Sequence, residues 1–290
     1  MQNSQIRALV VLLISLAIST GLVVSAQYQQ THTGPLSTIA ICAILAFGIQ
    51  WLAFIPAYLK QTERFYDLTG SVTFIAVTFY AIVNQPLLSV TSILLAAMVV
   101  IWAARLGTFL FMRINKDGID GRFDEIKPDK YRFFAAWTLQ GLWVLITAGA
   151  ALTVITSVQQ AHTHWLTWCG LAIWLFGFLF EVIADDQKFR FKQDPNNHKQ
   201  FIHNGLWGYS RHPNYFGEIT LWFGVAIAAL PVLTGWQHVA LISPLFVTLL
   251  LTKVSGVPLL EQRADQKWQN NPDYQAYKSR TPVLVPKFTK

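Results

Sequence analysis

The chain reads Gly205-Leu-Trp-Gly-Tyr-Ser-Arg-His-Pro-Asn-Tyr-Phe-Gly-Glu218 and continues without a break into an apolar segment, residues 219–230. The first part holds Arg, His, Asn, two Tyr and Glu within fourteen residues. Polar groups packed this densely beside an apolar run are costly unless each finds a partner. The stretch therefore indicates a polar site at the boundary of a membrane.

The composition of the whole chain is that of a membrane protein. Hydrophobic residues make up 53% and charged residues 13% of the 290 residues, whereas soluble domains carry about 25% charge. Apolar runs close to the length that spans a bilayer, about 20 residues, recur along the chain. They predict an all-α, polytopic helical bundle with seven or eight transmembrane helices, near residues 8–26, 37–58, 69–84, 88–112, 133–156, 165–184, 214–230 and 238–254.

The charges predict the orientation of these helices. Four alternate connections, 27–36, 84–87, 157–164 and 231–237, contain no Lys, Arg, Asp or Glu. All 22 Lys and Arg lie in the other connections or at helix ends that face them. Because positive residues favour the cytoplasmic side, both termini are predicted to be cytoplasmic. The net charge of +7 is explained by this bias and not by a nucleic-acid patch, since it is spread over several loops.

No linker, low-complexity tract or repeat divides the chain, so the sequence predicts a single membrane domain. The apolar run Ala8–Val24 is longer than the core of a usual signal peptide and is interpreted as a retained first helix. Cys42 and Cys169 fall in different predicted helices, where packing is the favoured role. No metal is predicted, because His162 and His164 lie in a charge-free connection away from the other polar clusters.

Within the opening stretch, Pro213 suits the first turn of a helix, where its missing N–H costs nothing. Arg211 and His212 then lie at a positive helix N-terminus, which suits a phosphate or pyrophosphate. Asn214 and Glu218 are four residues apart and share one helix face, which must look into the protein. The alternative is that Arg211 and Glu218 only anchor and pair the end of the helix.

A second cluster, Glu181, Asp185, Lys188 and Lys192, lies at the cytoplasmic end of the run 165–184. Spacings of four, three and four place these residues on one stripe of a helix. Two carboxylates followed by two ammonium groups could bind a ribose and then a phosphate. Ordinary ion pairs on a helix end that emerges into water explain the same spacing equally well.

Two further clusters lie nearer the N-terminus. Arg105 is the most membrane-embedded cation, and burying it without a partner would cost at least ~2.5 kcal/mol, which favours a functional role. Tyr66 and Asp67 lie where the chain re-enters the bilayer. Asp67, with Thr69 and Ser71, could cap the helix that follows, or Tyr66 and Asp67 could face a substrate cavity.

These motifs resemble those of the steroid 5α-reductase-like membrane proteins, and most of all their bacterial branch. The stretch 205–218, followed by an apolar hairpin, is similar to the C-terminal region of that family. The same branch shows Phe-Tyr-Asp-Leu-Thr-Gly-Ser and Arg-Leu-Gly segments, here Phe65–Ser71 and Arg105–Gly107. Its tail pairs a Leu-Leu-Glu with a Tyr-x-x-Tyr and a late Thr-Pro, here residues 259–261, 274–277 and 281–282. Sterol reductases and isoprenylcysteine methyltransferases carry related Arg-His motifs.

The resemblance implies NADPH-dependent reduction of a carbon–carbon double bond in a lipid-like substrate, such as a steroid, an enone or an isoprenoid, in the bacterial inner membrane. It implies an N-terminal hairpin over 1–64 and a reductase-like region over 65–290, with the cofactor-binding part at 181–290. The cofactor-binding residues that follow from the motifs are Arg105, Glu181, Asp185, Lys188, Tyr209, Arg211, His212, Asn214, Tyr215, Glu218, Glu261 and Arg263.

Reduction of an enone needs an electrophile at the oxygen and then a proton at carbon. The steroid reductases place a Tyr three residues before their cofactor-binding Arg, and this chain has Trp102 there, which donates a hydrogen bond but supplies no proton. Tyr66, Asp67 and Trp102 are the predicted catalytic residues, and Glu63 and Tyr80 are further replacements. Two other functions stay open: an S-adenosylmethionine-dependent membrane methyltransferase and a non-catalytic, lipid-binding membrane protein.

Overall fold

The computed structural model describes the chain except residues 1, 28–29, 119, 159–162, 199 and 289–290. The described chain is helical apart from loops and one small hairpin, in which β1 (His32–Thr33) pairs antiparallel with β2 (Leu36–Ser37). The longer helices are α1 (Gln2–Ala26), α2 (Thr38–Leu59), α3 (Tyr66–Val83), α4 (Val90–Asp117), α5 (Lys130–Ile155), α6 (Trp165–Gln193) and α7 (Pro213–Ala229).

The C-terminal part is built from shorter pieces. A 3-10 segment, Gly235–Leu241, leads into α8 (Ile242–Leu249), which ends in a π-helical turn, Leu250–Val254. α9 (Val257–Trp268) and α10 (Pro272–Arg280) follow, each with Pro in its first turn. Two further 3-10 turns, Pro195–Asn197 and Gly205–Gly208, join α6 to α7.

Within the described residues, seven helical segments are long and apolar enough to cross a membrane, which confirms the prediction of an all-α, polytopic bundle. These segments are Asn3–Ala26, Thr38–Leu59, Tyr66–Val83, Val90–Lys116, Lys130–Ile155, Trp165–Gln193 and Gly235–Trp268. The predicted span 214–230 corresponds to α7, which with 17 residues is shorter than all of them. The predicted run 165–184 continues as helix to Gln193, since its charged end packs against the opening motif, as described below.

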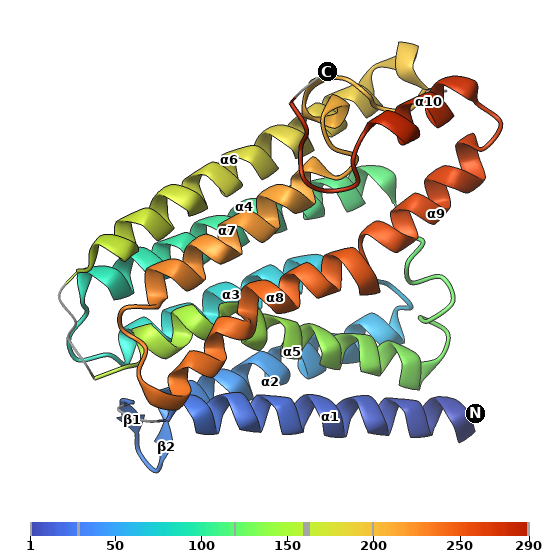
Figure 1. Ribbon diagram of the computed structural model, residues 1–290. Coiled ribbons are helices and arrows are strands. Elements are labelled where there is room, and N and C mark those ends of the chain that lie inside the picture. Colours follow the sequence, from blue (N-terminus) through green and yellow to red (C-terminus); the bar gives the residue numbers. More distant parts are fainter. Residues whose placement is uncertain (1, 28–29, 119, 159–162, 199, 289–290) are drawn as a thin grey trace. The chain divides into compact units, whose positions relative to one another are not determined.

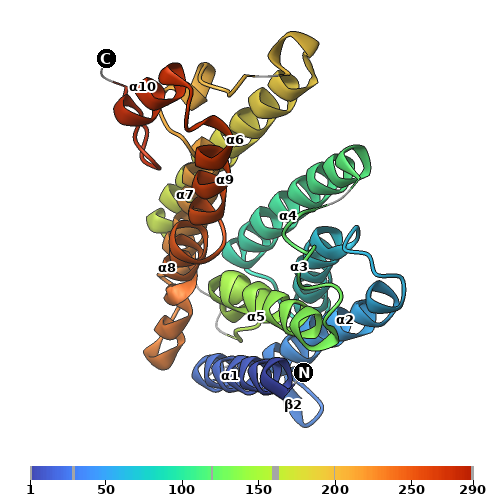
Figure 2. The same cartoon turned by 90° about the vertical axis from the view of Figure 1, so that its right-hand side faces the viewer.

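The chain forms two compact units, Met1–Thr167 with Ala228–Ser243 and Trp168–Ile227 with Pro244–Lys290. In the first unit α5 is the central helix. In the most apolar stretch of α5, 89% of the residues are buried, whereas the share in α1 is 17%. α5 packs against α1, α2, α3 and α4. Figure 2 shows these four helices on different sides of α5. The prediction of a single membrane domain stays a prediction.

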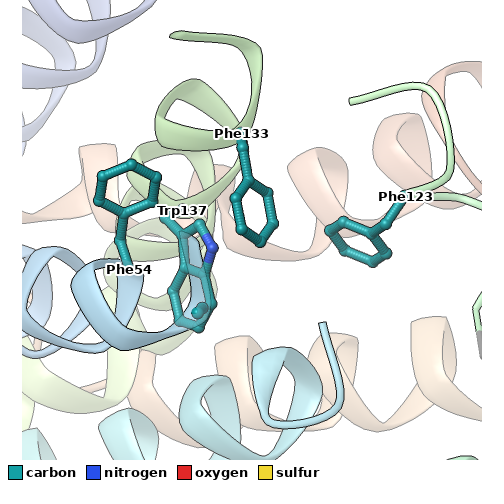
Figure 3. Packing of buried hydrophobic residues seen from close by; sticks show 5 residues of the cluster. Phe54, Phe123, Phe133 and Trp137 are labelled. Carbon is teal, nitrogen blue, oxygen red and sulfur yellow. The ribbon is translucent and has the colours of Figure 1, made fainter. Parts of the chain in front are cut away.

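An aromatic cluster closes one end of the first unit. Phe54 of α2, Phe133 and Trp137 of α5, and Phe123 of the loop before α5 are all buried and in one cluster (Figure 3). The rings of Phe123 and Phe133 meet edge to face, with centroids 6.1 Å apart. Edge-to-face pairs of this kind add to the free energy gained by burial. The loop is therefore held to the helices by a buried aromatic side chain.

Candidate functional site

In the second unit, α6 and α7 run side by side (Figure 1), and their backbones approach closely at glycines. A Cβ added to Gly217 would lie 2.5 Å from the backbone nitrogen of Glu181, and one added to Gly224 would lie 2.6 Å from that of Trp174. Contacts this short leave no room for a side chain, as at the small-residue interfaces of membrane helices. Gly217 precedes Glu218, so the packing brings the backbone of Glu181 beside the motif of α7.

The predicted charged stripe of α6 runs from the interior to the surface. Glu181 and Asp185 are 2% and 6% exposed, whereas Lys188 is half-buried and Lys192 is exposed. Carboxylates are almost never this buried unless they are paired. The burial shows that Glu181 and Asp185 do not lie on a helix end that emerges into water, and their role as a site stays a prediction.

The start of the opening motif packs on the same part of α6. Leu206 N donates a hydrogen bond to Gln187 Oε1 (2.9 Å), and Trp207 Nε1 donates one to the carbonyl oxygen of Ala184 (2.9 Å). The ammonium group of Lys188 lies 4.4 Å from the centroid of the Trp207 ring, a cation–π contact. Residues from both predicted clusters are therefore next to one another in this unit.

α7 begins at Pro213, as predicted. The two backbone N–H groups just before it are used within the protein. Arg211 N donates to the carbonyl oxygen of Pro282 (2.9 Å), and His212 N donates to Ser210 Oγ (3.2 Å). An anion at this end of the helix would therefore meet the side chains of Arg211 and His212 and not these two N–H groups.

A charged cluster surrounds the carboxylate of Glu261 in α9. Its Oε2 atom lies 2.8 Å from Arg211 Nη1 and 4.0 Å from Lys278 Nζ, and its Oε1 atom lies 2.8 Å from His212 Nε2. The side chains of Arg211 and His212 are 11% and 5% exposed. The ring of His212 also stacks on that of Tyr215, with centroids 5.6 Å apart. The start of α7 and one face of α9 thus form one partly buried polar site.

Three buried atoms of this site have no hydrogen-bond partner among the described residues: Arg211 Nε, His212 Nδ1 and Arg211 Nη1. Arg211 Nη1 lies at ion-pair distance from Glu261, so Nε and His212 Nδ1 are the two of these atoms without any polar partner in the described chain. Burial lowers the pKa of His212, and the hydrogen bond to Glu261 offsets this only in part, so the neutral imidazole is favoured. A buried guanidinium with an unused N–H is suited to an anionic ligand, because charge-assisted hydrogen bonds are the strong ones.

α10 joins this cluster from the tail, which the sequence did not predict. Lys278 Nζ lies 2.5 and 2.7 Å from the two carboxylate oxygens of Asp265, and the Tyr274 hydroxyl donates to Asp265 Oδ1 (3.1 Å). The Tyr277 hydroxyl donates to the carbonyl oxygen of Trp207 (2.7 Å). Opposite charges on two separate helices leave no periodic signal, so only the folded tail reveals this contact.

In the first unit, Tyr66 and Asp67 have partners of their own. The Tyr66 hydroxyl donates to the carbonyl oxygen of Ala136 (2.9 Å), and Asp67 Oδ2 lies 3.0 Å from Arg122 Nη2. The helix cap of α3 is Phe65, which makes no side-chain capping hydrogen bond. The interpretation of Asp67 as a cap is therefore wrong, because its carboxylate pairs with an arginine of the loop before α5.

The same loop is tied to Glu63 by a buried ion pair. Glu63 Oε1 accepts a hydrogen bond from Asp120 N (2.9 Å), and its Oε2 accepts one from Lys127 Nζ (2.5 Å). Burial alone would raise the pKa of Glu63, but these two hydrogen bonds outweigh it and the pKa is lowered. Neither Asp120 nor Lys127 belongs to a motif, and the sequence does not reveal their pairing.

Trp102 and Arg105 lie on α4 of the first unit. Trp102 is 1% exposed and meets the ring of Phe74 edge to face, with centroids 5.2 Å apart. Arg105 is half-buried, and its guanidinium carbon lies 5.2 Å from the centroid of the Phe109 ring. Catalytic roles for Tyr66, Asp67 and Trp102 stay predictions, as does cofactor binding by Arg105.

The other predicted residues lie in the second unit. Tyr209, Asn214, Tyr215 and Glu218 are half-buried, and Arg263 is exposed on α9. Of the two histidines weighed as metal ligands, His164 accepts a hydrogen bond at Nδ1 from Leu166 N (3.2 Å), and His162 lies outside the described residues. In the described part of the chain, no three His, Cys, Asp or Glu side chains come together as metal ligands.

Comparison with known proteins places these residues in a family. Residues 53–281 match the model of the family described as "Protein of unknown function (DUF1295)". The chain is also 22% identical, over 192 residues, to an uncharacterised protein of Schizosaccharomyces pombe, C594.04c. That similarity covers 56% of this chain, which spans about half (55%) of the length of the yeast protein. No solved structure matches.

Proposed function

The chain belongs to the DUF1295 family, and from its own residues we propose that it is a membrane reductase that uses NADPH to reduce a carbon–carbon double bond in a lipid-like substrate. One observation carries the proposal. The second unit holds a buried arginine, Arg211, with an unused N–H, in the same motif that packs on the part of α6 from which the buried Glu181 and Asp185 come. The diphosphate of NADPH needs a cation such as Arg211, and its ribose hydroxyls need acceptors such as the carboxylates of Glu181 and Asp185.

The residues present fit such a cofactor. Arg211 offers a cation that is only 11% exposed, so a phosphate bound to it would be shielded from water and from salt. Asp185 is a buried acceptor for ribose hydroxyls, and half-buried Asn214 has both an amide donor and an acceptor for a carboxamide. When bound, NADPH would supply a hydride to the substrate.

The neutral state of His212 agrees with this role. A neutral imidazole that donates from Nε2 to Glu261 keeps Nδ1 as an acceptor, and that atom has no partner in the described chain. Glu261 would therefore hold Arg211 in place, and its other partner, His212, would add no second positive charge. The lipid-like nature of the substrate is supported by the seven segments long and apolar enough to span a membrane. The inner membrane of a bacterium and cytoplasmic termini belong to the same proposal.

Thermal unfolding of the detergent-purified chain tests the proposal, because a ligand that binds the folded state stabilises it. NADPH at 100 times its dissociation constant should stabilise the fold by about 2.7 kcal/mol, seen as a higher Tm. S-adenosylmethionine should leave the Tm unchanged. A shift with S-adenosylmethionine and none with NADPH would instead indicate a methyltransferase. No shift with either, together with a co-purified lipid in mass spectrometry, would indicate a lipid-binding protein.

A further inference from the structure

A cavity of about 330 Å³ lies in the tail of the second unit, between the segment 200–203 and α10. Its lining includes Phe201, His203, Asn271, Asp273, Tyr277 and Arg280. The volume is at the lower end of the range found for small-molecule sites, about 300–1,000 Å³. It is suited to one part of a ligand, such as a nucleoside, and is too small for a whole dinucleotide.

α10 has two distinct faces: one is fixed to Asp265 of α9, and the other lines the cavity and is anchored by Tyr277. Tyr274 and Lys278 are four residues apart and both contact Asp265 of α9. Asp273, Tyr277 and Arg280 follow at spacings of four and three and line the cavity on another face. No ion pair of Asp273 or Arg280 occurs among the described residues. Because both are exposed, their charges are available to a ligand.

The aromatic wall of the cavity is held rigidly. The ring of Phe201 packs on those of Tyr274, Tyr277 and Trp268, with centroid distances of 5.3, 5.4 and 6.0 Å. Tyr277 is further fixed by its hydrogen bond to the carbonyl oxygen of Trp207. A rigid aromatic face loses little conformational entropy when a planar base stacks on it.

The cavity is close to the site at the start of α7. Arg280 precedes Pro282 by two residues, and the carbonyl oxygen of Pro282 accepts a hydrogen bond from Arg211 N. Two residues span at most about 7 Å. Lys278 of the same helix contacts Glu261, which also pairs with Arg211. A ligand with a diphosphate at Arg211 could therefore extend into the cavity.

We propose that this cavity binds the adenosine 2′-phosphate end of NADP(H), with Arg280 as the residue that recognises the 2′-phosphate. The inference rests on the proposed function and extends it from the diphosphate to the choice between NADPH and NADH. Phe201 and Tyr277 supply the face for the base, and Asn271 and Asp273 supply groups for the base edge and the ribose. Arg280 supplies the fork of donors that matches a phosphate.

The test is calorimetric titration of the full-length, detergent-purified chain with 2′,5′-ADP and with 5′-ADP. Wild-type protein should bind 2′,5′-ADP more tightly. Arg280→Gln should weaken binding of 2′,5′-ADP about tenfold or more, the effect of one charge-assisted hydrogen bond pair, and should change 5′-ADP binding less than twofold. Arg280→Lys keeps the charge but loses the forked pair of donors, so its affinity for 2′,5′-ADP should lie between those of wild type and Arg280→Gln.

Arg190→Gln is the matched control, because that arginine belongs to the same unit, is 79% exposed and pairs with Asp186 away from the cavity. It should bind both nucleotides like wild type, and the Tm of each variant without ligand checks that it folds. Unchanged 2′,5′-ADP binding in a folded Arg280→Gln protein would overturn the inference and leave the proposed function standing. If the wild-type chain binds neither NADPH nor 2′,5′-ADP, both are overturned.

Discussion

His212 and Glu261 are joined by a contact of 2.8 Å between Nε2 and Oε1, across 49 residues of sequence. The contact links the start of α7 to α9, and the other oxygen of the same carboxylate pairs with Arg211. One glutamate thus orients two consecutive residues of the opening motif. Removing it should affect both the stability of the second unit and the position of its buried cation.

Glu261→Gln should destabilise the chain by about 2 kcal/mol, because a hydrogen bond to a charged group contributes about 1.5–3 kcal/mol and a buried arginine is left without its counter-ion. The readout is the Tm in detergent without ligand. Asp186→Asn is the control, since it removes a carboxylate from an exposed i,i+4 pair with Arg190, worth about 0.3–0.5 kcal/mol. Equal losses in the two variants would contradict the role assigned to Glu261.

Stability should fall as the pH is lowered through the range in which His212 titrates. Burial lowers the pKa of His212 in the folded chain below its ordinary value of 6.5. Below that value the unfolded chain takes up a proton that the folded chain does not, so the contribution is complete above pH 6.5 and is lost toward lower pH. His212→Gln should flatten the decline in Tm between about pH 7 and 5, whereas His198→Gln, at an exposed position, should not.

Gly217→Ala should separate α6 from α7. The new Cβ would meet the backbone of Glu181 at 2.5 Å, and backbone cannot move aside as a flexible side chain can. Overpacking typically costs about 1–3 kcal/mol, so the variant should show a lower Tm and a weaker response to NADPH. Gly21→Ala in α1, where nothing lies within 4 Å of the added Cβ, should be neutral or stabilising by up to about 1 kcal/mol. A Gly217→Ala protein as stable as wild type would contradict the close packing.

Arg211→Gln should weaken NADPH binding about tenfold or more, because a phosphate would lose a charge-assisted hydrogen bond in a shielded site. Fluorescence titration of NADPH gives the affinity, and Arg190→Gln again serves as the control. The unliganded Tm should be reported alongside, since Arg211 also pairs with Glu261. If the folded variant binds NADPH with the affinity of wild type, the diphosphate is not bound at the start of α7.

Local patterns were enough to predict most of the helices and the core of the candidate site. Apolar run length predicted α1 to α6, and Pro213 predicted the start of α7, because both signals depend only on neighbouring residues. The i,i+4 spacing of Glu181 and Asp185 predicted a shared face, and their burial agrees with it. The π-helical turn after α8 and the hairpin of β1 and β2 have no comparable signal and were not predicted.

Contacts between distant segments could not be predicted from the sequence. The residue type and position of Asp67 suit a helix cap, so the local sequence suggested that role. The interpretation failed because the carboxylate pairs with Arg122, which is 55 residues away and leaves no local signal. In the same way, nothing near Asp265 in the sequence points to Lys278. Such pairs form only when the tertiary structure brings distant loops and helices together. Spacing rules apply within a single helix or strand, so they do not predict these pairs.

Glu63→Gln should loosen the loop before α5 in the first unit. The pair with Lys127 is buried, with side chains 3% and 15% exposed, and removing one partner of a buried pair typically costs about 3–5 kcal/mol. Because the pKa of Glu63 is lowered in the folded chain, its contribution is complete above the ordinary value of 4.5 and is lost as the pH falls below it. The variant should therefore lose Tm at neutral pH and differ less from wild type in acid. Glu125→Gln, at an exposed position of the same loop, is the control and should have the Tm of wild type at neutral and at acid pH. If the Glu63→Gln protein has the same Tm as this control at neutral pH, the pair of Glu63 and Lys127 does not hold the loop.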